Sequence, residues 1–213
     1  MNAGNARMNR CRWCGEDPLY VRYHDEEWGV PQQDSDRLFE FLVLEGAQAG
    51  LSWITILRKR EGYRDIFEGF SAERLAGWSD ERLETALQSP QLVRNRLKVW
   101  SVRQNARVVV ELRDSGTAFN DYLWRFVEHQ PVVNHWQSDS EVPPQTSLSA
   151  RISKDMKKRG FVFVGPTIIY AFMQAVGMVN DHVVSCFRHR ECIGLTTHAA
   201  PFKGTVDTAK KNT

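Results

Sequence analysis

The sequence contains no long apolar run. No stretch of its 213 residues approaches the roughly 20 apolar residues that a membrane-spanning helix needs. The first ten residues are polar and lack the apolar centre of a signal peptide. We therefore expect no membrane association and a cytoplasmic location.

Cysteine is scarce as well. The chain has four, which are Cys11, Cys14, Cys186 and Cys192. In the absence of an export signal, metal ligands or buried thiols are expected before disulfides, because disulfides persist mainly in oxidising compartments. The cysteines therefore point to a metal.

The chain also lacks a strong charge of either sign. Its formal net charge is +2, which gives only weak support for an anionic partner. Basic residues do gather locally, in segments 94–107 and 154–159. Each segment could hold phosphates or could be a solvated helix face.

Alternating strand patterns are scarce, whereas helical spacings recur, so the expected fold class is all-α. The longest pattern predicts a helix over about 36–60. Pro90 breaks a helical stretch and leads into a long amphipathic run, which predicts a helical hairpin. An extended crossover loop is expected over 131–147. The other helices are predicted at about 72–77, 80–87, 95–113, 119–126, 148–159 and 166–177, with a last one that begins near Asn180 or Asp181 and has Asp181 as its cap.

His182 and Cys186 form the first pair of residues that could carry chemistry. They are four apart within the predicted last helix, which would place both side chains on one face, as half of a zinc site. Cys11 and His24 could supply the other half, and a closed set of four would join the two ends of the chain. The alternative is a satisfied core histidine with inert thiols. Cys14 could compete with Cys11 as a ligand, since the two form a C-x-x-C pair.

Glu45 is the second such residue, because its helical neighbours Leu38, Phe41, Leu42 and Ala49 are all apolar. A carboxylate on an apolar face is costly to bury, and acids of this kind are enriched at functional sites. The alternative is a glutamate at the edge of the apolar face with its carboxyl group exposed to water.

Aromatic residues are dense near the N-terminus. Such rings usually fill a core, but they can also sandwich a planar ligand, and ring faces attract cations in particular. The rings are Trp13, Tyr20, Tyr23, Trp28 and Trp53.

Several motifs together resemble the type I 3-methyladenine DNA glycosylases of bacteria. They follow one another in the order and with the spacing of that family, over about residues 10–187. The motifs are Cys11-Arg12-Trp13, Asp17-Pro18-Leu19-Tyr20, Tyr23-His24-Asp25, Glu27-Trp28-Gly29-Val30, Leu44-Glu45-Gly46, Gln48-Ala49-Gly50-Leu51-Ser52-Trp53, and Val179-Asn180-Asp181-His182-Val183-Val184 with Cys186.

The resemblance implies a role for each site residue. It implies one structural zinc ion on Cys11, His24, His182 and Cys186. It implies that Glu45 and Tyr23 hydrogen-bond the damaged adenine, that Trp53 stacks on it, and that the other rings, Trp13, Tyr20 and Trp28, shape the pocket. The hairpin would hold a DNA phosphate, with Arg94 and Arg96 as its basic flank, and Gly50 and Leu51 would lie at the DNA surface near the gap left by the extruded nucleotide. Cys14 and Cys192 match no ligand of the family pattern.

The expected organisation is a helix-hairpin-helix bundle in one domain over residues 10–190, with the hairpin near 85–110 and disordered tails at 1–9 and 203–213. The expected reaction is hydrolytic excision of 3-methyladenine from double-stranded alkylated DNA by a monomer, which releases the free base and leaves an abasic site. Two other functions remain open from the sequence. One is a zinc-containing DNA-binding module without catalysis, and the other is a zinc hydrolase, which would need an open coordination position.

Overall fold

The computed structural model describes residues 8–198, and the side chains up to residue 195. Most of the predicted N-terminal tail, residues 1–7, and all of the predicted C-terminal tail, residues 203–213, lie outside the described residues.

The described chain is mostly helical, as the sequence predicts. Single 3-10 turns and two very short strands separate the helices. The α-helices are α1 (Pro18–Glu26), α2 (Ser35–Gln48), α3 (Trp53–Leu57), α4 (Arg60–Ile66), α5 (Ala72–Ala76), α6 (Asp80–Leu87), α7 (Arg96–Asp114), α8 (Phe119–Trp124), α9 (Ser147–Lys158), α10 (Pro166–Ala175) and α11 (Phe187–His198). The 3-10 turns are η1 (Arg12–Cys14), η2 (Glu68–Phe70), η3 (Arg125–Val127) and η4 (Asp139–Glu141), and the strands are β1 (Val132–Val133) and β2 (Val179–Asn180).

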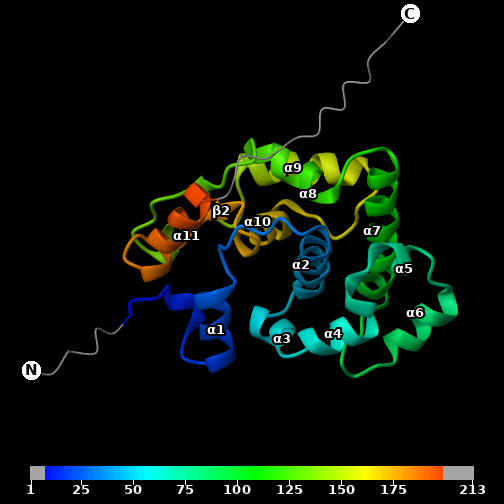
Figure 1. Cartoon of the computed structure of the whole chain (residues 1–213). Coiled ribbons are helices and arrows are strands. Elements are labelled where there is room, and N and C mark those ends of the chain that lie inside the picture. Colours follow the sequence, from blue (N-terminus) through cyan, green and yellow to red (C-terminus); the bar gives the residue numbers. More distant parts are fainter. Residues whose placement is uncertain (1–7, 199–213) are drawn as a thin grey trace, which may run out of the picture.

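Helix α2 forms the centre of the fold. Figure 1 shows it between α1 on one side and α5 to α7 on the other, with α10 beside it. Its residues from 38 to 47 are all buried. An Asp34 side chain accepts a hydrogen bond from the Arg37 amide and caps its N-terminus. Because the stretch 38–47 is buried on all sides, the two acids it carries, Glu40 and Glu45, lie inside the protein.

The prediction of one continuous helix over 36–60 is wrong, because the helix is interrupted after Gln48 and resumes as the short α3 at Trp53. Helix α2 ends at Gln48, and Ala49 leaves the helical conformation with ψ 114°. Gly50 follows with φ +81°, in the left-handed region that favours glycine. The side-chain ammonium of Lys98 donates to the carbonyls of Ala47 and Ala49, which satisfies the free end of α2. The break turns the chain outward before α3 begins at Trp53.

The predicted hairpin is present as α6, a turn over residues 88–95, and α7. The Ser79 and Asn95 side chains cap the two helices by accepting from the backbone amides of Arg82 and Lys98. The turn is held from inside, because the Val93 amide donates to the Tyr63 hydroxyl.

The last helix differs most from its prediction. Strand β2 pairs in parallel with β1, so residues 181–186 form an irregular segment beside the crossover loop, and α11 begins only at Phe187. Asp181 is therefore not a helix cap, and His182 and Cys186 do not share a helix face. Among residues 8–198, no helix is long and apolar enough to cross a membrane.

Candidate active site and metal centre

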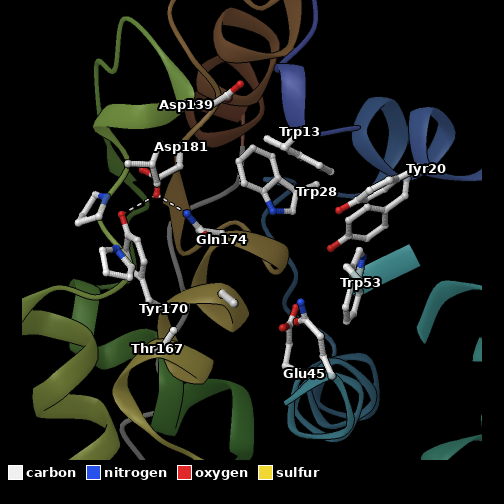
Figure 2. Close-up of a pocket in the computed structure, with 16 residues that line it drawn as sticks. Trp13, Tyr20, Trp28, Glu45, Trp53, Asp139, Thr167, Tyr170, Gln174 and Asp181 are labelled. Atoms are coloured by element: carbon white, nitrogen blue, oxygen red, sulfur yellow. Dashed lines mark hydrogen bonds between the residues drawn. The ribbon is translucent and has the colours of Figure 1, made fainter. Parts of the chain in front are cut away.

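A cavity of about 390 Å³ opens between the N-terminal aromatic residues, helix α2 and helix α10, and we call it the aromatic pocket. Figure 2 shows Trp13, Trp28 and Tyr20 along one side and Glu45 with Trp53 below them. Tyr170 and Asp181 lie across from these rings (Figure 2). All five rings predicted from the sequence line the cavity, together with Glu45.

The aromatic wall is one connected cluster of rings. Trp13 lies 4.9 Å from Trp28 and 5.1 Å from Tyr20, centroid to centroid. Tyr23 lies 5.4 Å from Trp53. Burial raises the pKa of Tyr20 to about 12 and that of Tyr23 well above its ordinary value, so both hydroxyls stay protonated at neutral pH. A planar ligand would meet ring faces, ring edges and two neutral hydroxyl groups.

Two residues that line this cavity each have a buried polar atom without a hydrogen-bond partner. These atoms are Oε2 of Glu45 and Nε1 of Trp53, an acceptor and a donor. Glu45 is only 4% exposed, and its burial raises the pKa to about 8. Because a buried polar atom is costly when unpaired, these two atoms are the ones that a bound ligand would satisfy.

The wall formed by α10 was not identified from the sequence. Tyr170 and Gln174 are four residues apart on one face of α10, and Thr167 lies one turn before them. Asp181, which the sequence suggested as a cap, is buried here and accepts hydrogen bonds from Tyr170 and Gln174. The amphipathic spacing of α10 was a usable signal for this wall, but nothing in the sequence indicated which of its faces meets the rings.

A second buried group, which we call the polar cluster, lies behind the aromatic wall. The ligand atoms of Cys11, His24, His182 and Cys186 all lie within 4.8 Å of one another, and this group could hold a metal ion. The Cys186 sulfur is 3.5 Å from Nε2 of His24 and 3.6 Å from Nδ1 of His182, and the Cys11 sulfur is 3.6 Å from the same His182 nitrogen. A hydrogen bond from the Cys11 thiol lowers the pKa of Cys186, and burial lowers the pKa of His182. The group therefore favours a thiolate and a neutral imidazole, which are the forms that bind metals.

Both histidines are oriented through their second ring nitrogen. Nδ1 of His24 lies 2.7 Å from Oδ1 of Asp25, and Nε2 of His182 lies 3.0 Å from the carbonyl of Trp28. Such partners fix which nitrogen faces the ligand position. Trp28 also lines the aromatic pocket, so the polar cluster and the pocket share a wall. Cys14 and Cys192 are buried but do not belong to this group.

The residues predicted to meet DNA lie at the surface. Leu51 is 42% exposed in the break after α2, and a side chain added at Gly50 would meet nothing within 4 Å. Arg94 is exposed in the hairpin turn, and no acidic side chain in the described part of the chain pairs with it. Arg96 is instead paired with Glu84 and lies over the Trp100 ring at 3.9 Å.

Comparison with known proteins places this geometry in one family. A family described as methyladenine glycosylase matches residues 13–189. DNA-3-methyladenine glycosylase 1 of Escherichia coli is 51% identical over 179 residues, which are 84% of this chain and 96% of that protein. A crystal structure of 3-methyladenine DNA glycosylase I superposes with a TM-score of 0.83 at 48% identity, over 84% of this chain and 98% of the other. A structure of the Staphylococcus aureus enzyme, which concerns its recognition of 3-methyladenine, has a TM-score of 0.81 at 33% identity, over 84% of this chain and 95% of that one.

Proposed function

The chain belongs to the methyladenine glycosylase family, and on that premise we propose that the aromatic pocket holds the methylated adenine during excision. The protein is a DNA-3-methyladenine glycosylase, which removes 3-methyladenine from DNA by hydrolysis of the bond to the sugar. The single observation that supports the pocket as the site is the unpartnered, buried Glu45 carboxyl among its rings.

The charge of the substrate determines what the pocket must do. Methylation at N3 makes the adenine cationic and weakens its bond to the deoxyribose, so the base is already a good leaving group. In our proposal Glu45 and Tyr23 hydrogen-bond the base, Trp53 offers its ring face to the positive charge, and Trp13, Tyr20 and Trp28 shape the remaining wall. Recognition of the cation then replaces strong acid catalysis.

The nucleotide must leave the duplex before the pocket can hold its base. Unstacking and flipping cost about a few kcal/mol, and a damaged base costs less than an intact one. In our proposal Gly50 and the exposed Leu51 lie against the gap that the flipped nucleotide leaves. Water then attacks the sugar cation from solvent, and the strand stays intact because no lysine attacks the sugar.

The hairpin turn is proposed to hold a DNA phosphate, with Arg94 and Arg96 beside it. We expect Arg94→Ala to weaken binding to methylated and unmethylated duplexes alike, by about threefold to tenfold, and to reduce the salt dependence of binding, because phosphate contacts carry no sequence information. Arg96→Ala should cost less, since Glu84 already neutralises that guanidinium. Fluorescence anisotropy across a salt series measures both effects.

The matched control for that experiment is Arg190→Ala, an exposed arginine on α11, at the other end of the molecule from the hairpin (Figure 1). It should bind both duplexes as the parent does. A loss confined to the methylated duplex in Arg94→Ala would show that the residue reads the lesion and not the phosphate.

We propose further that the polar cluster binds one zinc ion with a structural role. Zinc bonds of about 2.3 Å to sulfur and 2.0 to 2.1 Å to nitrogen, in a tetrahedron, place neighbouring sulfur and nitrogen ligands about 3.5 Å apart. The three sulfur to nitrogen distances of 3.5, 3.6 and 3.6 Å fit that figure. Four protein ligands leave no open position for substrate, which argues against a zinc hydrolase.

Release of free base from methylated duplex DNA by the purified protein tests the proposed function directly. We expect 3-methyladenine to be released with the strand left uncut until the abasic sites are cleaved chemically. A protein that binds the duplex without releasing base would instead be the DNA-binding module considered from the sequence. The monomeric state, the cytoplasmic location and the single domain over residues 10–190 stay predictions, and light scattering after gel filtration would test the first of them.

A further inference from the structure

Asp181 is the most densely hydrogen-bonded acid near the aromatic pocket. It is 2% exposed, and its Oδ1 accepts from the Asn134 amide at 2.6 Å and the Trp136 indole at 2.8 Å. Its Oδ2 accepts from the Tyr170 hydroxyl at 2.5 Å and from Nε2 of Gln174 at 2.8 Å. Donors therefore converge on both oxygens from two sides.

This arrangement decides how Tyr170 and Gln174 face the cavity. A carboxylate only accepts hydrogen bonds, so the amide of Gln174 must direct its nitrogen toward Asp181 and its oxygen elsewhere. The Tyr170 hydroxyl donates its only proton to the same carboxylate. Toward a ligand, each of the two side chains is left with an oxygen that can only accept.

The donors to Asp181 come from different parts of the fold. Tyr170 and Gln174 line the pocket from α10, across from the rings, and Figure 2 marks their bonds to Asp181. Asn134 and Trp136 follow β1 in the crossover loop and do not line the pocket. The loop thus anchors Asp181 from behind, and Asp181 in turn orients the wall in front of it.

We propose that Asp181 is a positioning residue that makes the α10 wall of the pocket an acceptor-only surface, through Tyr170 and Gln174, and that this wall selects the cationic base over a neutral one. The inference rests on the proposed role of the pocket. Acceptor oxygens carry partial negative charge, so they stabilise a methylated, positively charged adenine more than an intact adenine of nearly the same shape. Specificity then comes from two opposing sides, Glu45 on α2 and the oriented oxygens on α10.

The test compares two free bases that differ in charge. The probes are 3,9-dimethyladeninium, which is a permanent cation, and 9-methyladenine, which is neutral. For each variant the ratio of the two dissociation constants is measured by calorimetry. We expect Tyr170→Phe and Gln174→Met to reduce the preference for the cation by about threefold to tenfold, the effect of losing one polar contact.

Asp181→Asn tests the orientation with Tyr170 and Gln174 still present. It also removes a charge that lines the pocket, so Tyr170→Phe and Gln174→Met, which keep that charge, decide the test. The amide introduced there offers hydrogens in place of one acceptor oxygen, so the Tyr170 proton is released and the Gln174 amide can turn its nitrogen toward the ligand. The preference for the cation should fall as in the two wall variants, although Tyr170 and Gln174 are still present. A variant with weakened packing alone would lose affinity for both probes and keep the ratio.

Tyr122→Phe is the matched control, since Tyr122 also donates to a carboxylate, that of Asp155, away from the pocket. It should keep the parent ratio. An unchanged ratio in Tyr170→Phe and Gln174→Met would overturn the proposal, even if Asp181→Asn fails to fold. Failure of the parent protein to excise 3-methyladenine would count against the proposed function instead, because the ratio of dissociation constants is measured without excision.

Discussion

Replacing Glu45 by glutamine is expected to slow the single-turnover excision of 3-methyladenine about tenfold to a hundredfold. The substitution keeps the shape of the side chain and removes its charge, and a buried hydrogen bond to a charged group is worth about 1.5 to 3 kcal/mol. Discrimination against intact adenine should relax as well, because the neutral amide no longer favours a cation. A much larger loss would mean that Glu45 also stabilises the sugar cation or positions water.

Glu45→Gln should also change the pH profile. With its pKa raised to about 8 by burial, the acid is mostly protonated in the empty pocket at neutral pH. If the carboxylate is the form that recognises the cation, kcat/KM of the parent should rise with pH up to about 8. This rise of kcat/KM with pH should be absent from Glu45→Gln. Binding of the cation lowers the pKa again, so calorimetry in buffers of different ionisation enthalpy should detect proton release.

The raised pKa of Glu45 also makes the stability of the folded protein depend on pH. The folded state holds this proton more tightly than the unfolded state, whose Glu45 has the ordinary value near 4.5. The parent should therefore lose stability relative to Glu45→Gln as pH rises from about 4.5 to about 8, and no further above that. Thermal unfolding of both proteins across this range measures the difference.

Glu40→Gln is the matched control on the same helix. Glu40 is buried too, but it is paired with Arg37, Arg60 and Arg64 and does not line the pocket. Its loss should lower stability and leave the rate of excision nearly unchanged. Parent-like excision in both Glu45→Gln and Trp53→Ala would remove the aromatic pocket from the mechanism.

Loss of the metal is the second change with a large expected effect. Zinc contributes about 10 to 16 kcal/mol of apparent binding free energy in zinc-finger peptides, comparable to the whole stability of a domain. We expect one zinc per chain by elemental analysis. Cys186→Ser should lower stability by about 4 kcal/mol or more, which corresponds to a fall in Tm of about 8 to 16 °C for a chain of this size.

The effect of Cys186→Ser on the chemical step should be smaller than its effect on stability, because four protein ligands would leave the ion closed to substrate. Cys192→Ser removes another buried thiol, outside the cluster, and should keep the zinc and most of the stability. A chelated protein that stays fully folded and loses only activity would contradict the structural role.

Much of the local structure follows from the sequence. Helical spacing and caps predict α6 with its observed bounds and α7 to within one residue at each end, because both helices depend on near neighbours along the chain. The residue types at Cys11, His24 and Glu45 also indicated a metal and a buried acid before any contact was known. Helix α1 was not predicted, although its local signals are present: the Asp17 side chain caps it, and Pro18 is its first residue.

The sequence analysis grouped His182 with Cys186 correctly, but for a wrong reason. Their spacing suggested a shared helix face, yet the two residues lie in an irregular segment that the β1 and β2 pairing holds in place. Their sulfur and nitrogen atoms nevertheless meet at 3.6 Å.

The sequence by itself determined the fold class, the helices with local caps and the residue types of the site. The tertiary structure alone decided which side chains face one another: it ended α2 after Gln48, made Asp181 an acceptor for four donors and placed Tyr170 across from the rings. The physical reason is that capping and helical periodicity depend on residues within one or two turns, whereas the burial and hydrogen bonding of Asp181 depend on residues up to 47 positions away.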